Sequence, residues 1–189
     1  MRIAHVSDIH IRNLKYHAEY RRVFSGFYEE LSKRNIDLVV NTGDTAHTKT
    51  QISPEFVQMA SDLFVGVAKI CPMVNILGNH DLNLMNSDRQ DAISPIVETL
   101  SNPNVILLKK SGRFDQPTAK TDPITFWNFG ISDTVNWPGR PYPDDRINIG
   151  LFHGSVFNCL TDSNFRMTHA EVDLKMFDHL DFVMMGDIH

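Results

Sequence analysis

Side chains that can bind metal ions follow five short apolar runs of the chain, at the point where each run ends. They are Asp8 and His10, Asp44, Asn79 and His80, His153, and finally Asp187 and His189. A single Asp-x-His triplet arises often by chance, but five such endings in one chain are a different signal. Because ligands bind beyond the carboxyl ends of the strands in open α/β sheets, residues this far apart in sequence can converge in space. We therefore expect one metal centre whose ligands come from segments spread over nearly the whole chain.

The types of these residues indicate catalytic cations rather than a structural zinc. Asp8 and His10 are separated by one residue, so both side chains leave an extended backbone on the same side and can bind one ion. The carboxylate of Asp44 has two oxygens with which it can bridge two ions, while Asn79 and His153 offer an amide oxygen and an imidazole to the second. A donor set without thiolate suits manganese, iron or zinc in a catalytic setting.

Hydrolysis of a phosphoester is the reaction that such a centre favours. Two cations roughly 3.5 to 4 Å apart can share a hydroxide and flank a phosphoryl group in an in-line displacement. His80 lies next to a ligand, so its ring can donate a hydrogen bond or a proton toward the phosphate or the leaving oxygen. Asp81 follows His80 and is a candidate to orient that ring.

Strands and helices alternate between these groups. Strand-length apolar runs lead into the five groups at residues 3–6, 36–40, 73–77, 147–152 and 182–185, and two further strands are expected at 105–108 and 124–129. Apolar residues at helical spacing predict helices through 20–31 and 56–70, with shorter helices at 94–100 and from 168 toward 177. Ser53 and Ser94, each followed by proline, are the expected N-caps of two of these helices. The alternation predicts an α/β fold, with surface loops at 111–123 and 132–146.

Length and composition describe one globular domain. The chain has 189 residues, and it has no apolar run long enough to span a membrane and no signal-peptide pattern, so a cytoplasmic location is expected. Its formal net charge of −5 argues against a broadly basic surface for nucleic acid. A phosphate substrate is still compatible with that charge, because two bound divalent cations would add four positive charges at the site.

The motifs resemble the signature of the calcineurin-like metallophosphoesterases, over essentially the whole chain. The matching segments are Asp8-Ile9-His10, Gly43-Asp44, Gly78-Asn79-His80-Asp81, His153 and Gly186-Asp187-Ile188-His189. Within that superfamily, residues 1–10 and 177–183 are similar to the SbcD-like DNA nucleases and the phage recombination endonuclease subunit. His47, three residues after Asp44, matches a histidine that helps those nucleases to handle the DNA end.

This resemblance implies two mixed β-sheets packed as a sandwich and flanked by helices, with two divalent metal ions, usually manganese. One ion is expected at Asp8, His10, Asp44 and His189, and the other at Asp44, Asn79, His153 and Asp187. His80 is expected to stabilise the transition state. The resemblance also implies DNA as the substrate, a homodimer, a coiled-coil ATPase (SbcC-like) partner and an origin in a bacterial or phage-infected cell.

One ligand position departs from the family pattern. Asp187 stands where the family usually has histidine. Aspartate can ligate manganese through oxygen, so we expect a working second site with harder ligands. The alternative is a solvated Asp187 that turns outward and leaves a weakened second site.

Three functions remain open from the sequence. The first is a manganese-dependent DNA exonuclease or endonuclease in recombination and double-strand-break repair, favoured by His47 and the similar flanking segments. The second is a phosphatase or cyclic-nucleotide phosphodiesterase with the same dinuclear centre. The third, an interaction module without activity, is disfavoured because only residue 187 departs from the ligand pattern. We also expect residues 1–189 to be a single domain, truncated at its C-terminal end from a longer chain, because a ligand at a terminal His189 would fray.

Overall fold

The computed structural model describes residues 1–86, 89–161, 163–170 and 172–188. The first part of the chain alternates strand and helix in the order β1 (Ile3–Val6), α1 (His17–Lys33), β2 (Leu38–Asn41), α2 (Pro54–Ala68), β3 (Met73–Ile76), α3 (Ser94–Leu100) and β4 (Val105–Leu108). The second part contains β5 (Gly112–Asp115), β6 (Ile124–Phe129), the 3₁₀ turn η1 (Thr134–Asn136), β7 (Ile147–His153), the 3₁₀ turn η2 (Leu174–Phe177) and β8 (Phe182–Gly186). None of the described helices combines the length and apolarity needed to cross a lipid bilayer.

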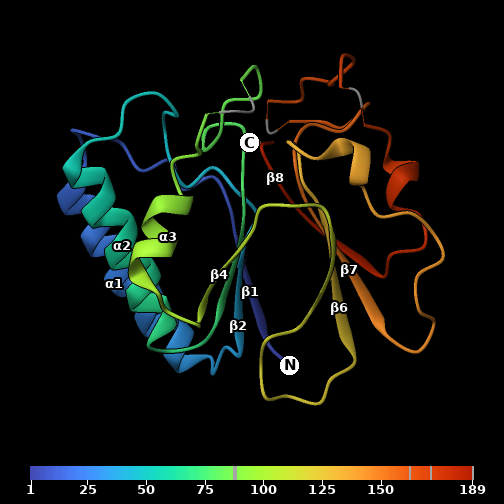
Figure 1. Cartoon of the computed structure of the whole chain (residues 1–189), viewed down its shortest axis with the longest axis horizontal. Coiled ribbons are helices and arrows are strands. Elements are labelled where there is room, and N and C mark those ends of the chain that lie inside the picture. Colours follow the sequence, from blue (N-terminus) through green and yellow to red (C-terminus); the bar gives the residue numbers. More distant parts are fainter. Residues whose placement is uncertain (87–88, 162, 171, 189) are drawn as a thin grey trace.

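The strands form two four-stranded sheets that pack against each other. The first sheet has the order β1-β2-β3-β4 and is parallel throughout. In the second sheet, β6, β7 and β8 are parallel and β5 runs antiparallel beside β6. Helices α1, α2 and α3 cover one face of the first sheet, and the second sheet covers the other (Figure 1). The predicted α/β fold, with two packed sheets and flanking helices, is confirmed.

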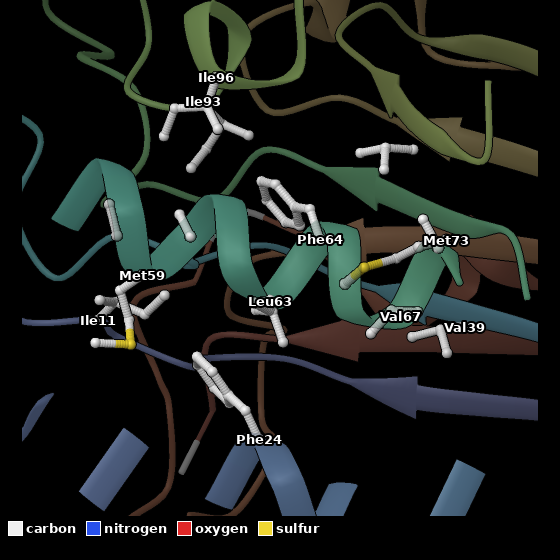
Figure 2. Close-up of a cluster of buried hydrophobic side chains, with 14 of the residues drawn as sticks. Ile11, Phe24, Val39, Met59, Leu63, Phe64, Val67, Met73, Ile93 and Ile96 are labelled. Atoms are coloured by element: carbon white, nitrogen blue, oxygen red, sulfur yellow. The ribbon is translucent and has the colours of Figure 1, made fainter. Parts of the chain in front are cut away.

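Helix α2 lies at the centre of the larger apolar core. Figure 2 shows Phe24 of α1 on one side of this helix, with Ile93 and Ile96 on the other. A separate apolar cluster fills the space between the two sheets, where Leu38 of β2 and Leu151 of β7 are fully buried. The strands β2 and β3 are buried along their whole length, since both faces of the first sheet are covered. That burial explains why apolar residues predominate in both strands, and the buried Asn41 and Asn75 side chains are hydrogen bonded to each other at 3.1 Å.

Three local predictions change in the structure. Ser53 caps α2 as expected and accepts a hydrogen bond from the Phe56 N–H at 3.1 Å, but Ser94 does not cap α3. The N-cap residue of α3 is Ile93, and the carboxylate of Asp91 accepts from the N–H groups of Ile93 and Ser94 at 2.9 and 2.6 Å. The helix expected from residue 168 toward 177 is only the short turn η2, and Glu171 of its capping pattern lies outside the described residues. Strand β5 falls within the segment predicted as a loop.

Candidate metal centre

The loops that follow β1 and β2 run side by side and bring three ligand-type residues together. The Asp8 N–H donates to the Gly43 carbonyl at 3.0 Å, and the His10 N–H donates to the Asp44 carbonyl at 2.9 Å. These bonds extend the pairing of β1 with β2 beyond the ends of the strands. The parallel strands therefore place Asp8 and His10 beside Asp44, at the edge of the sheet where the sequence predicted them.

Asp44 belongs to two groups of donor atoms. In the first group, the donor atoms of His10, Asp44 and His80 lie within 4.8 Å of one another, and in the second group those of Asp8, Asp44 and His153 do so. The first group therefore includes His80, which was not an expected ligand, and the second includes Asp8, which was expected beside His10. His10 Nε2 lies 3.7 Å from Asp44 Oδ2, whereas His153 Nε2 lies 3.3 Å from Asp44 Oδ1. Because a different oxygen faces each imidazole, Asp44 has the geometry expected of a bridging carboxylate.

His153 and Asn79 each direct a buried polar atom into the second group. The Nδ1 of His153 is hydrogen bonded to the Thr42 carbonyl at 2.6 Å, so this nitrogen carries the proton and a neutral ring keeps its lone pair on Nε2. Within the described residues, neither His153 Nε2 nor Asn79 Oδ1 has a hydrogen-bond partner. Buried polar atoms are normally paired, and a cation between these two atoms and Asp44 would pair both. The residues present therefore fit a divalent metal ion.

The charges of Asp44 and His153 depend on each other. Burial raises the pKa of Asp44, but the neighbouring His153 and the backbone N–H of His80 lower it, and the net pKa is below the ordinary value. Burial lowers the pKa of His153, but Asp44 raises it above the ordinary value. The protein thus keeps Asp44 as a buried anion that requires a positive neighbour, which either an imidazolium or a metal ion can supply.

Asp187 points into the cluster rather than outward. Its Oδ2 accepts a hydrogen bond from the Ser155 hydroxyl at 2.7 Å, and its Oδ1 lies 3.4 Å from the Asn79 amide nitrogen and 3.9 Å from His153 Nε2. Its backbone N–H faces the Asp8 carboxylate at 3.1 and 3.2 Å. This orientation is compatible with ligation of the second ion and differs from the outward-turned alternative. His189, proposed for the first ion, lies outside the described residues.

His80 is oriented by the main chain of His47. Its Nδ1 is hydrogen bonded to the His47 carbonyl at 2.7 Å, and its ring lies 4.9 Å from the ring of His10. The His47 ring stacks 6.1 Å from that of His80 and lies 5.6 Å from that of His10. Burial, followed by the charges of Arg12 and the neighbouring imidazoles, lowers the pKa of His47. Three imidazoles therefore meet on one side of Asp44.

Asp81 does not orient His80, contrary to the expectation from sequence. Its side chain is completely buried, and its two oxygens accept the N–H groups of Ala46 at 2.8 Å and Gly78 at 2.9 Å. Burial raises the pKa of Asp81 to about 7, although both of these hydrogen bonds act to lower it. The carboxylate therefore ties the loop of Asp44 to the loop of Asn79 and His80, as a structural clamp.

The two loops approach so closely that only glycine fits at Gly78. A Cβ atom there would overlap Asp44 Oδ1 and the Asp44 backbone nitrogen. Gly43 has a φ of 101°, and a Cβ there would lie 2.7 Å from both the Gly78 nitrogen and His153 Nδ1. These glycines allow the backbone contact on which the cluster depends.

The sequence reasoning missed several residues that support the site. The Tyr20 hydroxyl donates to the His10 carbonyl at 2.7 Å, and the Lys49 ammonium donates to the Asn79 carbonyl at 3.2 Å. Neither residue carries a motif that would indicate these contacts. The role of Ser155 could have been suspected from the sequence, because it lies two positions after the proposed ligand His153.

The chain is similar to a known protein family and to individual known proteins. The sequence matches the calcineurin-like phosphoesterase family over residues 1–189. It is 37% identical over 206 aligned positions to the uncharacterized protein R555 of Acanthamoeba polyphaga mimivirus, an alignment that covers 99% of this chain but only 14% of that protein. Among solved structures, it is similar to the Pseudomonas putida nuclease MPE, with 16% identity, a TM-score of 0.43, and coverage of 87% of this chain and 66% of the nuclease.

The family match spans the loops that carry every described member of the donor cluster. Members of this family are typically metal-dependent with two ions, and the donor groups that share Asp44 suit that arrangement. The chain belongs to the calcineurin-like phosphoesterase family and is a metal-dependent phosphoesterase.

Proposed function

We propose that this domain is a manganese-dependent phosphodiesterase that cleaves DNA, as an exonuclease or endonuclease in recombination and double-strand-break repair. The observation that carries the proposal is the position of His47. Its ring lies beside His10 and His80 but outside both groups of donor atoms. A phosphodiester carries a second esterified group, which a residue beside the metal ligands could position. His47 lies in such a place and matches the histidine that helps SbcD-like nucleases to handle the DNA end.

The proposed metal ligands divide between two ions. Asp8, His10 and Asp44, together with His189, would hold one, and Asp44, Asn79, His153 and Asp187 the other. When bound, two divalent cations supply the positive charge that activates water and neutralises the phosphoryl oxygens. Oxygen and imidazole donors suit manganese.

His80 is the group that we propose for proton donation. The His47 carbonyl fixes its Nδ1, which leaves Nε2 as the only nitrogen of the ring available to the substrate. In the imidazolium form, Nε2 can donate a hydrogen bond or a proton to the phosphoryl or leaving oxygen. Lys49 and Arg12 add positive charge near His47 and Asn79, which favours a polyanionic substrate.

A phosphatase or cyclic-nucleotide phosphodiesterase is the second candidate. The net charge of −5 favours it, since extended contact with a nucleic-acid backbone is normally made by a basic surface. Both reactions use the same donor groups, so substrate preference must separate them.

The test compares substrates on the manganese-loaded protein. We expect cleavage of linear single-stranded or duplex DNA to exceed turnover of 4-nitrophenyl phosphate, and His80→Ala to reduce cleavage by about 10²- to 10⁴-fold, the usual contribution of a general acid. His179→Asn is the matched control, because His179 is exposed, lies before β8 and has a φ of 78° that asparagine tolerates. Turnover of the monoester without cleavage of DNA would falsify the nuclease proposal and favour the phosphatase.

We propose the partner subunits on the resemblance alone. A second copy of the chain and a coiled-coil ATPase are the partners of the resembled nucleases. Light scattering of the purified domain tests the homodimer, and co-purification with the ATPase subunit from the native host tests the second partner. A monomer at micromolar concentration would exclude a stable homodimer of this domain.

A further inference from the structure

A cavity of about 300 Å³ opens beside the second group of donor atoms. Asn79, His153 and Asp187 form one side of it, so the cavity is continuous with the proposed metal centre. The other sides are mainly apolar and include Trp137, Phe152 and Ile131. A phosphoryl group held at the donors would therefore have an apolar recess next to it.

Trp137 forms a fixed aromatic wall of this cavity. Its indole N–H donates to the Gly130 carbonyl at 2.9 Å, which holds the ring in place. The ring also packs edge-on against Phe129 and Phe152, with centroids 6.2 and 5.9 Å apart. Trp137 is only half-buried, so part of its ring remains available to a ligand. A ring that is already ordered loses little entropy when a ligand stacks on it.

The edge of the cavity carries polar groups suited to a heterocycle. Thr134, in the exposed turn η1, contributes a hydroxyl that can donate or accept a hydrogen bond. Ser155 also lines the cavity, but its hydroxyl is already bonded to Asp187. The volume is at the lower end of the ~300–1,000 Å³ found for small-molecule sites, which suits one flat aromatic group.

We propose that this cavity binds the nucleobase of a nucleotide adjacent to the scissile phosphate. The proposal rests on the proposed function and deepens it, because it specifies a nucleotide ester in which the base is unpaired. A small polar ester, such as a phosphorylated serine, has no group that would fill an apolar recess next to the phosphate. A base seated against Trp137 cannot remain stacked and paired in a duplex, so the substrate must supply an unpaired base.

The binding test compares two ligands that differ only in the base. Thymidine 5′-monophosphate and 2-deoxyribose 5-phosphate are titrated into the manganese-loaded protein by calorimetry. We expect the nucleotide to bind about tenfold more tightly, within the range for one base stacked on an aromatic ring. In Trp127→Phe, where Trp137 is the only tryptophan left, we expect the nucleotide to quench the fluorescence and the sugar phosphate to leave it unchanged.

Two variants test the cavity itself. Trp137→Ala removes the wall, and Ala170→Phe fills the cavity from another side without removing the contacts of Trp137 with Phe129 and Phe152. Either change should reduce the tenfold preference to about twofold or less. Trp127→Phe is the control and should keep the preference, because Trp127 does not line the cavity. If Trp137→Ala does not fold, the binding preference of Ala170→Phe alone tests the proposal.

The cleavage test separates this proposal from the proposed function. A single-stranded oligonucleotide is compared with the same strand carrying abasic residues in its terminal segment. We expect the wild type to cut the abasic strand about tenfold more slowly than the natural strand. The Ala170→Phe variant should cut the two strands at nearly the same rate. Equal cutting of both strands by the wild type, with equal binding of the two ligands, would overturn the nucleobase site and leave the nuclease standing. Tighter binding of the nucleotide without any DNA cleavage would overturn the nuclease and keep the site.

Discussion

Replacing Asp81 with asparagine tests whether this residue is a clamp between loops or a partner of His80. The carboxylate accepts one N–H group from the Asp44 loop, at Ala46, and one from the following loop, at Gly78. Asparagine is nearly the same size but has a single acceptor oxygen, so its amide group must face one of the two N–H donors. One buried donor is then left without a partner.

The expected loss of stability follows from these contacts. An unsatisfied buried N–H group costs about 1–3 kcal/mol. Because burial holds the pKa of Asp81 at about 7, a neutral amide also avoids part of the unfavourable burial of a charge. We therefore expect the free energy of unfolding of Asp81→Asn to fall by about 1–2 kcal/mol, which lowers the melting temperature by roughly 2–8 °C for a domain of this size.

The assay measures the melting temperature and manganese affinity of the same variant. Loosening the clamp moves the Asp44 and Asn79 loops relative to each other, so manganese should bind more weakly. Asp91→Asn is the matched control, since Asp91 is also buried and accepts backbone N–H groups, but at the start of α3. It should lower stability and leave manganese affinity unchanged. An Asp81→Asn protein with the wild-type melting temperature but impaired catalysis would refute the clamp and restore Asp81 as the residue that orients His80.

Three further predictions follow from named contacts. Asp187→Ala should reduce the manganese stoichiometry measured by calorimetry from two to one; an unchanged stoichiometry would show that Asp187 is not a ligand. Gly78→Ala should lower stability by about 1–3 kcal/mol and weaken manganese binding, because the new Cβ overlaps Asp44; wild-type melting and affinity would contradict the observed fit of the two loops. Burial, followed by the charge of Asp62, raises the pKa of Tyr28 from 10 to about 12, so its contribution to stability is complete below pH 10 and is lost as the pH rises through about 12. In Tyr28→Phe, the free energy of unfolding measured with urea should fall less steeply between pH 10 and 12 than in the wild type. The same pH dependence of this free energy in both proteins would refute the prediction.

The fold was predictable from sequence where strands are buried and not where they are exposed. The bounds of β1, β4 and β6 agree with the predicted runs. Every residue of β4 and β6 is buried or partly buried, which favours the apolar side chains that made these strands recognisable. Strand β5 has no such run, since Arg113 and Asp115 face solvent. Its strand conformation depends on pairing with β6, at the edge of the second sheet, and pairing of this kind leaves little trace in the local sequence.

The proposed ligands were predictable because each follows a strand, whereas their supports were not. Among the described ligands, the structure places Asp8, His10, Asp44, Asn79, His153 and Asp187 at one edge of the two sheets. The group that orients His80 is a backbone carbonyl, and every residue has one, so no residue type could reveal it. Asp81 was misjudged for a related reason: adjacency in sequence suggested His80 as its partner, but its side chain bonds backbone groups of two different loops.

The backbone conformation of the ligands indicates that the fold itself positions them. Asp8, His10, Asp44 and Asp187 all have positive φ, at 56°, 49°, 53° and 92°. Aspartate tolerates this region better than most residues, but each such residue still stores strain of about 1 kcal/mol or more. Strain of this kind persists only where the surrounding structure enforces it, and here the enforcement is visible in the bonds from Asp8 to the Gly43 carbonyl and from His10 to the Asp44 carbonyl. The loops are therefore held in their strained form by main-chain bonds and by the Asp81 clamp, so metal binding need not reorganise the backbone.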